Sequence, residues 1–168
     1  MKKRIKKHAF SQGAYLGLFL LLIMNIFYFS NPESIMSGFN TYSILFMLVL
    51  LIYPVISIYN FDFSTTESIF KDYFSTSFIM MLTALLITTF YSYLLYNFID
   101  CDLINQYVDL QYDTCLKNPN CNMSFEESLL LYKNDYFSIS GQLQSYVFAL
   151  IPCTLYSAII SLLMKIIK

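Results

Sequence analysis

Four long apolar blocks divide this chain and restrict what it can fold into. They cover about residues 10–29, 42–59, 73–98 and 143–167. A helix of about 20 apolar residues is long enough to cross the roughly 30 Å hydrocarbon core of a bilayer. Only 12% of the 168 residues are charged, whereas a soluble domain has about 25%. The sequence therefore predicts an all-α integral membrane protein, a four-helix bundle that forms one domain over residues 1–168.

The first block follows a basic segment, which is also how a cleaved signal peptide begins. The residues after the block are Ser30, Asn31, Pro32 and Glu33. They contain no small-x-small cleavage site, so we expect an uncleaved first span that Pro32 ends. A nucleic-acid partner for the basic segment is not expected, because such segments commonly flank a span on the cytoplasmic side.

The basic residues predict the orientation of the spans. Eight of the ten lie at the amino terminus, in the second connection or at the carboxyl terminus. The first connection, residues 31–41, has none, and residues 100–142 have two basic and seven acidic residues, a net charge of −5. The positive-inside bias therefore predicts a multi-pass protein of the bacterial inner membrane with both termini cytoplasmic and the loop 100–142 periplasmic.

That loop is too long for a simple link, and it has a helical pattern. Ser124 lies three residues before Glu127, which is the spacing of a capping box. The apolar side chains that follow recur on one helical face. We expect a helical hairpin, with one short helix on each side of the turn around Pro119. The residues expected on that face of the second helix are Phe125, Leu129, Tyr132 and Tyr136.

Cys115 and Cys121 flank the turn of this hairpin. In an oxidising compartment they can form a structural disulfide worth about 2 kcal/mol. Free thiols and a redox-active pair remain the alternatives. A zinc site is not expected, because the single histidine, His8, lies on the opposite side of the predicted membrane. The sequence indicates no metal, no cofactor and no catalytic residue.

The predicted span cores contain no Asp, Glu, Lys, Arg or His, although transporters usually place ionisable residues there. Small residues do recur at four-residue intervals, a spacing that lets another helix approach closely. They form a candidate helix-packing seam, either within the bundle or against a partner membrane protein. Its residues are Gly13, Gly17, Ala149, Cys153, Ser157 and Ser161.

Three segments of the chain form a recognisable pattern: the stretch Tyr91-Ser-Tyr-Leu-Leu-Tyr-Asn-Phe-Ile-Asp100, the outer segment Ser124-Phe-Glu-Glu127, and a last helix ending in Lys. Together they resemble a bacterial family called domain of unknown function 4199. The resemblance implies a small four-helix inner-membrane protein and transfers no catalytic residue. Cys101 stands where proline is common in that family, and the Cys115–Cys121 pair is not implied by it. Four spans with cysteines in the second outer loop also resemble the quinone-linked disulfide oxidases, but residues 31–41 lack the Cys-x-x-Cys pair that those enzymes need.

These features predict a non-enzymatic scaffold or accessory subunit of a membrane complex. Its partners are expected to be the lipid bilayer and another membrane protein, and its oligomeric state is left open. One alternative is a small transporter or channel, with a path lined by Thr88, Ser92, Asn97 or Ser157. The other is a thiol-disulfide redox protein that uses Cys115 and Cys121.

Overall fold

The computed structural model describes residues 3–36, 40–61, 63, 70–117 and 124–167, and these contain helices and short connections but no strand. Four of the helices are long and apolar enough to cross a membrane: α1 (Lys3–Ser30), α3 (Thr41–Asn60), α4 (Phe70–Leu94) with its π-helical continuation η1 (Leu95–Ile99), and α7 (Ile139–Ile167). These are the helices of a multi-pass membrane protein. Helix α1 begins at Lys3 rather than near residue 10, so the basic segment is itself helical.

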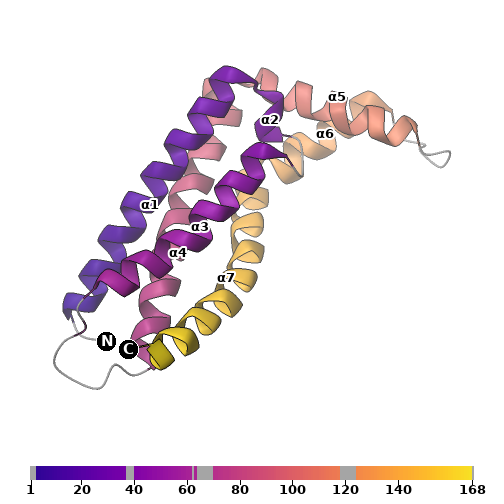
Figure 1. Cartoon of the computed structure of the whole chain (residues 1–168). Helices are drawn as coiled ribbons and strands as arrows, with labels where there is room; N and C mark the ends of the chain where they lie inside the picture. Colours follow the sequence, from indigo (N-terminus) through magenta and orange to yellow (C-terminus); the bar gives the residue numbers. More distant parts are fainter. Residues whose placement is uncertain (1–2, 37–39, 62, 64–69, 118–123, 168) are drawn as a thin grey trace.

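Helix α4 is the centre of the bundle, and α1 and α7 pack along it (Figure 1). The contact with α1 is close because Gly13 and Gly17 have no side chain. A Cβ atom at Gly13 would lie 2.8 Å from the carbonyl oxygen of Met80 and 2.8 Å from Cβ of Thr83. The two backbones can therefore approach more closely here than ordinary side chains permit.

The contact between α4 and α7 is also formed by small residues. Cys153, Ser157 and Ser161 are buried, and the hydroxyl of Ser77 on α4 donates to that of Ser157 at 3.2 Å. Ala149 packs against the same apolar core. The small residues of α7 thus face the interior of the bundle.

Helix α3 lies at the edge of the bundle, against α1 and α4 (Figure 1). It follows the short helix α2 (Glu33–Met36) and begins with a capping box between Asn40 and Ser43. Its middle is tied to α7, because the hydroxyl of Tyr156 donates to the carbonyl oxygen of Leu51 at 2.7 Å. Pro54 lies inside α3 and removes the backbone donor that would reach the carbonyl oxygen of Leu50, the residue before Leu51.

The segment between the third and fourth spans forms an arm, consisting of α5 (Asp102–Leu116), α6 (Phe125–Leu131) and η2 (Tyr132–Tyr136). The arm extends sideways from the end of the bundle opposite the two termini (Figure 1). The predicted capping box between Ser124 and Glu127 is present. The ring centroids of Tyr112 and Phe125 lie 5.8 Å apart, and those of Tyr107 and Tyr132 lie 5.3 Å apart, so α5 packs against α6 and the start of η2.

An aromatic cluster joins the arm to the bundle. The ring of Phe137 lies 4.8 Å from Tyr96 and 5.2 Å from Tyr107. Burial raises the pKa of Tyr107 from its ordinary value of 10 to about 12. The side-chain amide of Asn97 donates to the carbonyl oxygens of Tyr93 and Phe137, at 3.0 and 2.9 Å. The base of the arm is therefore fixed to the end of the third span.

Candidate functional site

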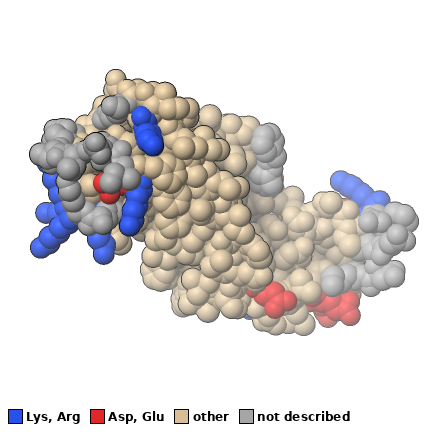
Figure 2. Space-filling model, turned by 90° about the horizontal axis from the view of Figure 1, so that it is seen from below, with Lys and Arg blue, Asp and Glu red and all other residues tan. Residues whose placement is uncertain are grey.

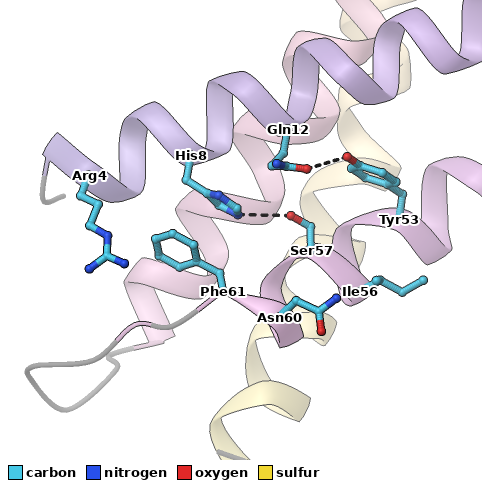
Figure 3. A pocket seen from close by; sticks show the side chains of 8 residues that line it. All are labelled: Arg4, His8, Gln12, Tyr53, Ile56, Ser57, Asn60 and Phe61. Carbon is cyan, nitrogen blue, oxygen red and sulfur yellow. Dashed lines mark hydrogen bonds between the residues drawn. The ribbon is translucent and has the colours of Figure 1, made fainter.

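A cavity of about 520 Å³ lies between the start of α1 and the end of α3, and we call it the α1–α3 pocket (Figure 3). Two rows of side chains at four-residue spacing face each other across it. Helix α1 contributes one row and α3, with the residue that follows it, contributes the other. The lining residues are Arg4, His8, Gln12, Tyr53, Ile56, Ser57, Asn60 and Phe61.

Two hydrogen bonds hold the two rows together. The hydroxyl of Tyr53 donates to Oε1 of Gln12 at 2.6 Å. The hydroxyl of Ser57 and Nε2 of His8 are 3.2 Å apart, and either can donate, depending on the tautomer of the ring. The oxygen of the Gln12 amide thus accepts a hydrogen bond, and its nitrogen donates none to a described residue.

An aromatic stack positions the cation at the mouth of the pocket. The ring of His8 stacks on that of Phe61 at 4.0 Å with an interplanar angle of 28°. The guanidinium carbon of Arg4 lies 5.4 Å from the centroid of the same Phe61 ring, a distance at which a cation is attracted to the ring face. Arg4 itself is exposed, and its guanidinium group is accessible from outside the protein.

The surroundings of the pocket are basic. Lysines at the starts of α1 and α4 and at the end of α7 lie at the same end of the molecule, where Figure 2 shows the blue side chains together. The acidic side chains gather mainly at the arm. No described residue that lines the pocket is acidic. The lysines concerned are Lys3, Lys6, Lys7, Lys71 and Lys165.

The candidate seam from the sequence lies inside the bundle. Gly13 and Gly17 face α4, and the small residues of α7 face the core, as described above. Five of these six positions are buried by described residues of the chain itself, and Ala149 is half-buried.

The cysteines occupy three different surroundings. Cys101 is exposed at the base of the arm and Cys153 is buried in the fourth span, and both are free thiols. Cys115 lies near the end of α5, and Cys121 lies outside the described residues. The Cys115–Cys121 disulfide, and the redox function that would use this pair, therefore stay predictions.

The four residues suggested for a transport path do not line a common cavity among the main cavities formed by the described residues. Ser157 is paired with Ser77 in the interior, and Thr88 donates to the carbonyl oxygen of Leu85 at 3.0 Å. Ser92 lines a cavity of about 170 Å³ next to Tyr96, whereas Asn97 lines a different one of about 240 Å³ next to Cys101. Among the described residues, every buried polar side-chain atom has a hydrogen-bond partner.

The residues of the α1–α3 pocket were not predicted from the sequence. The signal that indicates them is the four-residue spacing of Arg4, His8 and Gln12, which places all three on one face of a helix. His8 has no metal-binding partners, since the described residues hold no cluster of three or more His, Cys, Asp or Glu side chains.

The four apolar helices and the all-α bundle define a multi-pass membrane protein. The chain belongs to the family described as Protein of unknown function (DUF4199), whose sequence profile matches residues 12–165. No curated protein and no solved structure matched the chain. The resemblance inferred from the Tyr91–Asp100 stretch is thereby confirmed.

Proposed function

We propose that this protein is a non-enzymatic scaffold or accessory subunit of a complex in the bacterial inner membrane. Both termini lie in the cytoplasm and the arm lies in the periplasm. The observation that supports a role in assembly is the arm itself, a set of packed helices that extends beyond the four-helix bundle (Figure 1). A segment that only links two spans has no need of a second packed unit of this size.

The surface of the arm is suited to contact a partner. Asp102, Asp109 and Asp113 are exposed and fall on one face of α5. Leu116, at the end of α5, and Leu130, on α6, are each 60% exposed. Apolar side chains beside a charged face are typical of a protein-contact surface, so we propose that a membrane-protein partner with a basic surface binds here.

The proposed orientation is supported by the charge at the two ends of the molecule. Both termini lie at the end where the lysines gather, and the arm lies at the other end. Because cytoplasmic segments near a span carry an excess of Lys and Arg, the basic end is proposed to face the cytoplasm.

Site-specific photo-crosslinking in living cells tests the scaffold proposal. A photoreactive residue at Asp109 or Leu116 should give one discrete adduct with another protein. The same residue at Leu155, which is 65% exposed on the lipid-facing side of α7, is the matched control and should give none. A triple variant, D102K with D109K and D113K, should abolish the adduct. Recovery of only the uncrosslinked monomer from both arm positions would contradict the proposal.

Thiol labelling tests the orientation and the proposed disulfide together. In a Cys101→Ser variant, a membrane-impermeant maleimide should label intact cells only after treatment with an impermeant reductant. Labelling without the reductant would show that Cys115 and Cys121 are free thiols. Labelling that requires permeabilised membranes would place the arm in the cytoplasm and overturn the proposed orientation.

A further inference from the structure

We propose that the α1–α3 pocket binds a phosphate group, carried by the headgroup of an anionic phospholipid or by free phosphate. The pocket combines a positioned guanidinium group, neutral donors around a cavity and an apolar flank. Each of these features comes from the contacts described above, and together they define a ligand with a negatively charged, oxygen-rich head.

Tyr53, Ser57 and His8 form hydrogen bonds across the pocket, but other donors that line it have no acceptor among the described residues. Arg4 forms no ion pair with a described residue, and its contact with Phe61 leaves the N–H groups of the guanidinium fork available. The amide nitrogens of Gln12 and Asn60 donate no hydrogen bond to a described residue. An arginine fork binds phosphate through two parallel hydrogen bonds, and the amides can satisfy the remaining oxygens.

The electrostatic potential at the pocket also favours an anion. Five described lysines and Arg4 lie at this end of the molecule, with Asp72 as the acidic residue described there. Basic pockets between membrane-spanning helices on the cytoplasmic side are known binding places for anionic headgroups. A cation would be repelled by Arg4 at the entrance, and no described carboxylate lines the pocket to bind it.

The apolar flank distinguishes a lipid from a small soluble anion. Ile52 and Ile56 on α3 are 51% and 52% exposed, and Ile56 also lines the pocket. They stand one helical turn apart on the outward face of α3. An acyl chain attached to a headgroup in the pocket can therefore lie along this face, whereas free phosphate has no acyl chain to contact it.

Native mass spectrometry of the purified full-length protein in mild detergent tests the proposal. Phosphatidylglycerol and phosphatidylcholine are each titrated, and a third titration uses inorganic phosphate with thermal stability as the readout. We expect one tightly retained phosphatidylglycerol and no such retention of phosphatidylcholine. The variant Arg4→Gln should weaken the retained binding by about tenfold, the loss that corresponds to one charge-assisted hydrogen bond. Arg4→Lys should be intermediate, because it keeps the charge but loses the fork.

The matched control is Lys6→Gln, which removes the same charge from an exposed residue of α1 that does not line the pocket. It should leave the binding unchanged, and melting temperatures of both variants near that of the parent would show that they fold. Equal losses of lipid affinity in Arg4→Gln and Lys6→Gln would mean that the basic surface attracts anionic lipid in general, and this would overturn the site. Stabilisation by inorganic phosphate that depends on Arg4, without selective retention of phosphatidylglycerol, would identify free phosphate as the ligand. The absence of both effects would overturn the proposal.

Discussion

Several hydroxyl side chains within the spans donate hydrogen bonds to backbone carbonyl oxygens of their own helix. Thr76, Thr83 and Ser161 each donate to the carbonyl oxygen four residues earlier in the same helix, at 2.6, 2.8 and 2.5 Å. A hydroxyl paired in this way occupies little more room than a methyl group and leaves no unpaired polar atom in the interior. These residues therefore let the helices pack closely, and glycine does so further at the α1–α4 contact.

We predict that Gly13→Ala destabilises the bundle more than Gly17→Ala does. The new Cβ at Gly13 would press on backbone atoms of Met80, which cannot move independently of α4, whereas at Gly17 the nearest atom is the flexible end of Ile87, at 3.0 Å. Overpacking of this kind costs about 1–3 kcal/mol. Thermal unfolding in detergent measures the two variants, and an equal or larger loss in Gly17→Ala would contradict the assigned contact.

At the scale of elements, the arm depends on its caps and its aromatic base. Helix α6 has seven residues, too few to be stable alone in water. Its first turn is held by Ser124 and Glu127, and its face packs against α5. The order of the arm thus comes from a local capping signal together with aromatic contacts to Tyr107, which lies on α5, and to Phe137, which follows η2.

We predict that α6 loosens as the pH falls, because of Glu127. Its carboxylate accepts the backbone N–H of Ser124 at 2.9 Å, and this hydrogen bond lowers the pKa of Glu127 below the ordinary value of 4.5. A group whose pKa is lowered by folding stabilises the helix above its ordinary pKa, and that stability is lost as the pH falls through the lowered value.

Hydrogen exchange over residues 125–131, corrected for the intrinsic rate, should therefore show protection that decreases below about pH 4.5. Glu127→Gln should remove most of this pH dependence. Glu126→Gln is the control, since Glu126 is the neighbouring exposed acid and takes no part in the capping box. An unchanged pH profile in Glu127→Gln would exclude the carboxylate as the cause.

The features predicted correctly from the sequence are those with a local signal. Apolar length indicated the four spans, and the Ser124–Glu127 spacing indicated the start of α6. The spacing of Arg4, His8 and Gln12 indicates one helical face but not the α1–α3 pocket, which exists only where this face meets residues about fifty positions later in the chain. All of the pocket's polar side chains except Tyr53 also lie outside the predicted spans or within two residues of a span end, where hydropathy does not separate helix from loop.

At the scale of the whole molecule, the bundle is asymmetric. Helix α4 contacts each of the other three spans, whereas α3 lies at the edge and is fastened by individual polar ties. Tyr53 joins it to α1, and Tyr156 joins it to α7. The position of α3 decides the width of the α1–α3 pocket, so these ties connect the packing of the bundle with the proposed site.

We predict that Tyr156→Phe loosens α3 and lowers the stability of the bundle by about 0.6 kcal/mol, the mean for an interhelical hydrogen bond in a membrane. Tyr146→Phe should have a smaller effect, because the hydroxyl of Tyr146 reaches the carbonyl oxygen of Leu82 at 3.3 Å, compared with 2.7 Å for Tyr156. Chemical unfolding in detergent measures the difference. A larger effect of Tyr146→Phe would show that the Tyr156 tie contributes little.

The central place of α4 has a consequence for how the protein is made. A ribosome delivers α1 and α3 to the membrane before it has translated the helix on which α1 packs most extensively. During that interval the face of α1 that carries Gly13 and Gly17 contacts lipid. A nascent chain that stalls before Phe70 would therefore contain α1 and α3 without α4, the helix that both of them contact. We expect membrane proteases to degrade it.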